Sequence, residues 1–143
     1  DLAVHDLSIL FYLLKRNPIK SKSLKINSAQ SPKPDTAFIN LTYKNKLNVF
    51  IKNTWISPIK IRLMKFKFKN AIIYCDENES IYKIKIYYKK AKQAKYSLEV
   101  PEIDLTEPLS RLVNYIYKNI KNNERNVFDI MNINITKTLQ KIS

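Results

Sequence analysis

Glycine is absent from all 143 residues of the chain. Phosphate-binding P-loops, the dinucleotide-binding fingerprint and the nucleophile elbow of hydrolases all need glycine at defined positions, because a Cβ atom would block the backbone conformation or the approach of the ligand. The sequence therefore excludes these three motifs. Turns must depend instead on residues that tolerate a left-handed backbone. The candidates are Asn45, Asn53, Asn70, Asn78, Asn122 and Asn123.

Cysteine and histidine are almost absent, with Cys75 and His5 as the only examples. One residue of each kind forms neither an internal disulfide nor a zinc ligand set. His5 lies at the end of the chain, where chain ends tend to be mobile, and Cys75 precedes Asp76 and Glu77, whose charges oppose a thiolate. The sequence predicts no catalytic, metal-binding or cofactor-binding residue, no evident small-molecule substrate, and a protein that is not an enzyme.

One acidic segment, Asp76–Ser80, begins like a calcium-binding loop, with oxygen-bearing side chains at alternate positions. The loop needs glycine where this chain has Ile81 and a bidentate glutamate where it has Tyr87. We therefore expect a solvated turn.

Basic residues outnumber acidic residues by 26 to 12, which gives a net charge of +14. An excess of this size usually accompanies an anionic partner, although part of it follows here from a composition rich in residues with A/T-rich codons. Arginine, the residue that binds phosphate in a bidentate manner, occurs only at positions 16, 62, 111 and 125. The charge indicates loose electrostatic attraction more than specific recognition.

Alternating apolar and polar residues dominate the middle of the chain and predict strands. Residues 38–53 read as one long strand or as a hairpin that turns at Lys44–Lys46. Alternation continues over residues 59–68, where a change of parity after Leu63 predicts a β-bulge. Shorter strands are expected over residues 71–75, 82–88 and 96–100.

The two ends of the chain read differently from the middle. Residues 1–16 form an apolar helix or strand that packs into the core, and they are too short for a bilayer, which takes about 20 apolar residues. If further residues precede them, they are the inner end of an anchor or signal segment. Helical spacing of apolar residues predicts a helix over 107–121, capped by Thr106, and a last strand is expected over Val127–Ile135.

The fold class that follows is mainly β: an immunoglobulin-like β-sandwich with one amphipathic helix before the last strand and an apolar N-terminal segment. Its organisation is the apolar segment 1–16, an irregular basic segment 17–36, and the sandwich 37–143, all within a single domain overall.

Lysines alternate with aromatic residues in the central strands, which raises the question of nucleic-acid binding. Neighbours on a strand point to opposite faces, so the lysines should line one face and the aromatic rings the other, whereas a base-stacking platform needs both on one exposed face. We therefore expect contact with phosphates without stacking on bases. The candidate contacts to an anionic partner are Lys65, Lys67, Lys69, Lys83 and Lys85.

The order of elements from Lys22 to Thr136 resembles the water-stress and hypersensitive-response domain of late-embryogenesis-abundant proteins. The residues that carry the resemblance are Leu47–Asn53, then Trp55–Ile61, then Leu98–Pro101 ahead of the predicted helix. The chain departs from that pattern at Thr54, where the family usually has proline. The resemblance implies a β-sandwich with one helix, no active site, and a role in protection, tethering or assembly.

Two functions follow from the sequence. The preferred one is a non-enzymatic structural, scaffold or assembly protein with protein partners or self-assembly. The alternative is a basic protein that docks on nucleic-acid phosphates, as a ribosomal or virion component, without reading sequence; an anionic membrane surface is a further possible partner.

Overall fold

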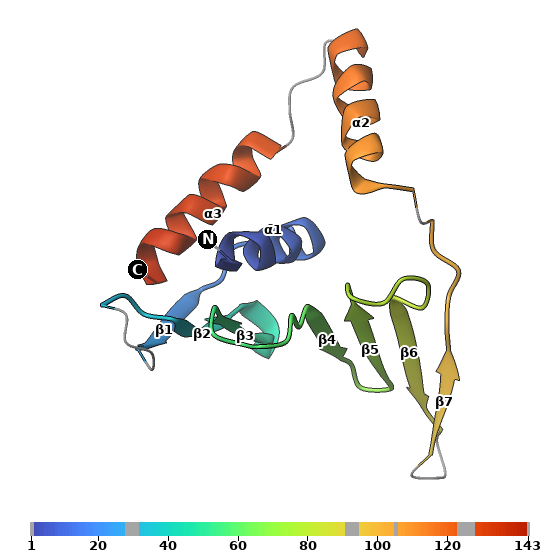
Figure 1. Cartoon of the computed structure of the whole chain (residues 1–143), viewed down its shortest axis with the longest axis horizontal. Helices are drawn as coiled ribbons and strands as arrows, with labels where there is room; N and C mark the ends of the chain where they lie inside the picture. Colours follow the sequence, from blue (N-terminus) through green and yellow to red (C-terminus); the bar gives the residue numbers. More distant parts are fainter. Residues whose placement is uncertain (1, 28–31, 91–94, 105, 123–127, 143) are drawn as a thin grey trace. The chain divides into compact units, whose positions relative to one another are not determined.

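The computed structural model describes residues 2–27, 32–90, 95–104, 106–122 and 128–142 (Figure 1). The chain divides into two compact units. Unit 1 comprises residues 1–57 and 119–143, and unit 2 comprises residues 58–118.

Unit 1 contains a three-stranded antiparallel sheet in the order β1-β2-β3. Its elements are α1 (Leu2–Leu14), β1 (Lys20–Ile26), β2 (Thr36–Thr42), the 3₁₀ turn η1 (Lys44–Lys46), β3 (Asn48–Thr54) and α3 (Phe128–Ile142). Both α1 and α3 lie on the same side of this sheet (Figure 1).

The hairpin reading of residues 38–53 is confirmed, because β2 and β3 pair through the 3₁₀ turn. Asn45 there has φ of 63°, as expected for an asparagine that replaces glycine in a tight turn, and Lys46 has φ of 60°. The segment expected to be irregular contains a full strand, since β1 pairs along its whole length with β2.

The core of unit 1 lies between the sheet and the two helices. Odd-numbered residues of β2 and β3 point to this side, so the alternation predicted from the sequence decides which strand residues are buried. The buried apolar side chains come from α1, β2, the residue after it, and α3: Leu7, Phe11, Ile39, Leu41, Tyr43, Ile135 and Ile142.

Unit 2 contains a four-stranded antiparallel sheet in the order β4-β5-β6-β7 and most of one helix. Its elements are β4 (Leu63–Lys67), β5 (Ala71–Asp76), β6 (Ile84–Lys89), β7 (Tyr96–Glu99) and α2 (Pro108–Asn122). The strand ranges agree with the sequence within two residues for β5, β6 and β7. No bulge occurs at Leu63, because β4 begins at that residue and pairs with β5 in continuous register.

The expectation of a last strand over Val127–Ile135 is wrong where the structure describes it, because residues 128–142 form α3. Met131 and Ile135, four residues apart, face the core, while Ile133 is 54% exposed. Alternation over five residues was thus a fragment of a helical pattern that continues to Leu139 and Ile142.

The mainly-β prediction is also wrong. The three α-helices cover about as many residues as the seven strands. In unit 1 the layer that packs on the sheet is helical, not a second sheet as an immunoglobulin-like sandwich requires. None of the described helices has the length and apolar character needed to cross a membrane.

Candidate functional site

One face of the unit 2 sheet collects basic and aromatic side chains from three strands. Antiparallel pairing sets Lys65 opposite Tyr74 and Tyr74 opposite Lys85, so these three residues share a face. Lys67 and Tyr87 lie on the same face, both paired with Ile72. We call the surface formed by Lys65, Lys67, Tyr74, Lys85 and Tyr87 the lysine–tyrosine face.

This arrangement corrects the expectation that lysines and aromatic rings lie on opposite faces. The expectation holds within β4, where Phe66 points away from Lys65 and Lys67. It fails across the sheet, because Tyr74 of β5 and Tyr87 of β6 have the register that turns them toward those lysines. Alternation gives the face of each residue within its own strand, but only the pairing tells which faces of neighbouring strands coincide.

The rings and charges of the face contact one another. The Lys65 ammonium nitrogen lies 5.2 Å from the centre of the Tyr74 ring, within the range of a cation–π interaction. The Tyr74 and Tyr87 rings meet edge to face with centres 5.6 Å apart. These contacts order the tyrosine pair while Lys65 and Lys67 remain exposed.

Lys85 is ion-paired, with its ammonium nitrogen 2.9 Å from Oε1 of Glu79. The hydrogen bond that the Lys85 ammonium group donates to Glu79, and then the negative charge of Glu79, raise the pKa of Lys85 above the ordinary lysine value. Because both side chains are partly exposed, the pair adds little to stability.

The other two candidate lysines lie off the strands. Lys69 is exposed in the connection between β4 and β5. Lys83 precedes β6, and its backbone carbonyl accepts a hydrogen bond of 2.9 Å from the Asp76 N–H. Within unit 2 the structure therefore gathers Lys65, Lys67 and Lys85 on one face of the sheet, with Lys69 and Lys83 at its margins.

An open hollow of roughly 410 Å³ lies beside the lysine–tyrosine face; Tyr74, Lys85 and Tyr87 of the face line it, whereas Lys65 and Lys67 do not. Besides members of the face, its lining includes Asp76, which adds a carboxylate, and apolar and aromatic side chains. The lining residues are Leu63, Ile72, Tyr74, Asp76, Lys85, Tyr87 and Tyr96.

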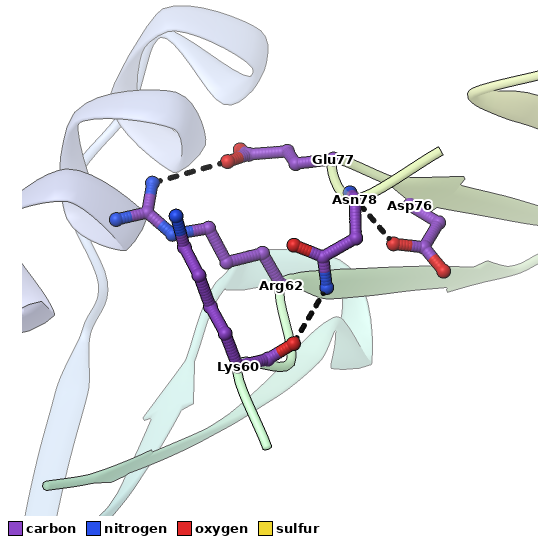
Figure 2. A network of polar contacts seen from close by, with 5 residues as sticks. All are labelled: Lys60, Arg62, Asp76, Glu77 and Asn78. Atoms are coloured by element: carbon purple, nitrogen blue, oxygen red, sulfur yellow. Dashed lines mark hydrogen bonds and ion pairs between the residues drawn. The ribbon is translucent and has the colours of Figure 1, made fainter. Parts of the chain in front are cut away.

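A polar network holds the end of β5 where Asp76 lies (Figure 2). The Asp76 carboxylate accepts a 2.9 Å hydrogen bond from the Asn78 N–H, and the Asn78 side chain donates to the Lys60 carbonyl at 2.7 Å. Arg62 and Glu77 form an ion pair at 3.2 Å. The acidic segment is thus a hydrogen-bonded turn, and the described residues contain no cluster of three or more potential metal ligands.

A second polar group lies at the start of α1 in unit 1. The Asn53 side-chain amide of β3 is oriented so that both its oxygen and its nitrogen have hydrogen-bond partners. The oxygen accepts a hydrogen bond from the Ala3 N–H at 3.1 Å, and the nitrogen donates one to the Asp6 carboxylate at 3.0 Å. A strand residue thereby caps the helix and binds its first turn to the sheet. His5, which is exposed, lies in this anchored turn.

Neither the anchored position of His5 nor the role of Asn53 was predicted from the sequence. His5 was expected at a mobile chain end and Asn53 in a turn. Asn53 instead follows Val49 and Ile51 as the next odd-numbered residue of β3, so it points to the side of the sheet that faces the helices. This alternation could have predicted its position.

A buried polar cluster at the start of β2 was also missed. The Thr36 hydroxyl donates a 2.9 Å hydrogen bond to the Asp35 carboxylate, and the Thr36 and Thr54 hydroxyl oxygens lie 2.9 Å apart. Asp35 and Thr36 are both buried. The cluster joins the ends of β2 and β3 and serves the fold of unit 1.

Comparison with known proteins gives a likeness at the level of structure alone. No family model matches the chain, and no curated protein matches its sequence. Among solved structures, UDP-N-acetylglucosamine 3-dehydrogenase GnnA from Acidithiobacillus ferrooxidans superposes with a TM-score of 0.77 at 17% identity, over 96% of this chain and 43% of that protein.

Two further solved structures give similar values. A protein assigned as an oxidoreductase from Magnetospirillum magnetotacticum has a TM-score of 0.75 at 14% identity, over 100% of this chain and 47% of its own. YvaA from Bacillus subtilis, likewise assigned as an oxidoreductase, has a TM-score of 0.77 at 13% identity, over 99% and 46%. The chain spans less than half the length of the solved structures it matches.

The fold is therefore an α+β fold found in oxidoreductases of this kind. This likeness contradicts the predictions of a non-enzymatic scaffold, of a basic protein docked on nucleic acid, and of a protein that is not an enzyme. It conflicts equally with a structural role like that of late-embryogenesis-abundant proteins.

Proposed function

We propose that this chain is the substrate-binding part of an oxidoreductase. The observation that carries the proposal is the structural likeness, which covers 96% or more of the chain and repeats in oxidoreductases at TM-scores of 0.75 to 0.77. The identity of 13–17% supports no transfer of individual residue roles, so those are argued from this chain's own side chains.

The residues of this chain do not fit a nicotinamide dinucleotide. Binding its pyrophosphate in the usual way requires a glycine-rich turn at a helix N-terminus, and the chain has no glycine. In the proposed enzyme, the cofactor is bound by residues outside this chain. The role of this chain is then to bind the substrate and to accept its proton.

His5 is the candidate group for proton transfer. It is the only imidazole in the sequence, and imidazole is the most frequent acid–base group in enzymes. It is exposed, while the Asn53 contacts to Ala3 and Asp6 anchor the helix that bears it. An exposed base on a fixed support is suited to accepting a proton from a substrate hydroxyl as that carbon is oxidised.

For the substrate we propose a nucleotide-linked sugar. GnnA carries in its name UDP-N-acetylglucosamine as substrate, and it is one of the structures with the highest TM-score here. The basic excess of the chain, 26 residues against 12, favours an anionic substrate of this class.

The test is reduction of NAD⁺ or NADP⁺ followed at 340 nm, with UDP-N-acetylglucosamine and related sugar nucleotides. The assay uses the natural polypeptide or complex that holds this chain, because the cofactor site lies outside it. We expect turnover, and we expect His5→Asn to lower kcat by about 10²-fold or more, the range typical of a lost acid–base group.

Tyr12→Asn is the matched control, because Tyr12 is an exposed polar side chain of the same helix. It should leave kcat within about twofold of the parent. Absence of cofactor reduction with every sugar nucleotide tried would contradict the proposed function. An equal loss of kcat in His5→Asn and Tyr12→Asn would contradict the role of His5 in proton transfer.

A further inference from the structure

We infer that the lysine–tyrosine face of unit 2 binds the nucleoside diphosphate portion of an anionic ligand; this rests on the proposed function and concerns unit 2 alone. The face is the surface defined above, and the hollow beside it is lined by Asp76 as well. Three kinds of group therefore meet on one surface: exposed ammonium groups, aromatic rings and a carboxylate.

The ammonium groups suit a diphosphate. Lys65 and Lys67 are alternate residues of β4, so they point to the same side about 7 Å apart. Both are exposed, and neither forms one of the ion pairs found among the described residues of unit 2, which involve Arg62, Lys85 and Arg111. Two neighbouring cations that the protein leaves unneutralised favour a ligand with two or more negative charges.

The aromatic rings suit a nucleobase. Tyr74 and Tyr87 meet edge to face, so the two rings present surfaces in nearly perpendicular directions, with an interplanar angle of 82°. Both rings are half-buried, and a planar base stacks on the accessible part of such a ring whichever base it is. Tyr96 lines the same hollow and adds a third ring.

The carboxylate suits a ribose. Asp76 is two residues from Tyr74 on β5 and lies on the same face. One of its oxygens already accepts the Asn78 N–H, which fixes the orientation of the side chain (Figure 2). A fixed carboxylate accepts hydrogen bonds from ribose hydroxyls, while it would repel a bare phosphate at the same position.

These groups discriminate among anionic ligands. Inorganic pyrophosphate uses the lysines alone, and a nucleoside uses the tyrosines and Asp76 alone. A nucleoside diphosphate engages all three. The structure therefore predicts that uridine diphosphate binds more tightly than either of its parts.

The experiment is calorimetric titration of the full chain with uridine diphosphate, uridine and pyrophosphate, without cofactor or turnover. We expect uridine diphosphate to bind at least tenfold more tightly than the other two probes. Lys65→Ala and Tyr74→Leu should each weaken its binding by about fivefold to tenfold, and affinity should fall as salt is added.

Matched controls come from the same unit. Lys60 offers only its backbone carbonyl to the network of Figure 2, and Tyr82 is exposed ahead of β6. Lys60→Ala and Tyr82→Leu should leave the affinity within twofold. Because Tyr74 is half-buried, Lys67→Glu is a second test that replaces only an exposed side chain, and it should abolish detectable binding.

The inference is overturned if the control variants weaken binding as much as those of the face, or if uridine diphosphate binds no better than pyrophosphate. Tighter binding of a single-stranded oligonucleotide than of uridine diphosphate would also overturn it. The two proposals can fail separately. If a sugar nucleotide is turned over and the Lys65→Ala and Tyr74→Leu variants turn it over equally well, only the binding site is contradicted. If uridine diphosphate binds but no sugar nucleotide is turned over, only the oxidoreductase function is contradicted.

Discussion

Two sheets of similar strand content differ sharply in how they bury their side chains. In unit 1, α1 and α3 cover one face of the sheet, and seven apolar residues there are buried. In unit 2, no described residue of the four strands is buried, and α2 exposes Leu112, Val113 and Ile116. Strand alternation is equally clear in both units. An alternating pattern therefore shows which side chains share a face, but it does not show whether another layer of structure covers that face.

The largest expected effect tests this difference directly. Leu41 of β2 is fully buried, and Leu41→Ala should lower the free energy of unfolding by about 3–5 kcal/mol. Ile73 of β5 is half-buried, and Ile73→Ala should cost about 1–2 kcal/mol, because less apolar surface leaves contact. Urea unfolding followed by circular dichroism measures both. Equal losses would show that the two units have equivalent cores.

A smaller effect is expected at the contact between α1 and β3. Asn53→Ala removes the cap of Ala3 and a hydrogen bond to Asp6, which should cost about 1–2 kcal/mol. Amide hydrogen exchange should accelerate in the first turn of α1 and remain unchanged in β5 and β6. Asn40→Ala, on the exposed face of β2, serves as the control and should have an effect below about 0.5 kcal/mol. Unchanged exchange in α1 would mean that Asn53 does not anchor the helix.

Among the described residues, the core of unit 1 contains a buried hydroxyl without a hydrogen-bond partner. The Tyr43 hydroxyl is buried and finds no hydrogen-bond partner among the described residues. Tyr43→Phe should therefore leave stability unchanged or raise it by up to about 1 kcal/mol, since the hydroxyl is desolvated without compensation. A loss of more than about 1 kcal/mol in thermal or urea unfolding would reveal a bond that the hydroxyl makes.

The smallest effect concerns Cys75 in unit 2. Burial raises the pKa of its thiol above the ordinary thiol value. The folded state then holds the proton more tightly than the unfolded state, so this contribution to stability is complete below the unfolded-state pKa and is lost as pH rises through the folded-state pKa. Unfolding measured from pH 8 to 11 should show a steeper decline in the parent than in Cys75→Ala. Parallel curves would contradict the burial of the thiol.

Much of the strand arrangement could be read from the sequence, because alternation of Ile39 and Leu41 or of Lys65 and Lys67 is a local property of the chain. The helix at residues 128–142 escaped prediction, since its first apolar residues alternate and only packing against α1 and the sheet distinguishes Ile135 from Ile133. Of the candidate lysines, Lys65, Lys67 and Lys85 lie on strands of one sheet, whereas Lys69 and Lys83 lie in the connections. The tyrosine neighbours of these lysines were placed on the wrong side of the sheet.

The sequence by itself determined part of what the chain lacks: without glycine it has no dinucleotide fingerprint, and with one histidine and one cysteine it has no zinc ligand set built from those residues. These are covalent facts, and no folding changes them. Only the tertiary structure decided that Tyr74 lies between Lys65 and Lys85, and that Asn53 fixes the turn bearing His5. Strand register and helix packing join residues distant in sequence, so no local pattern contains them.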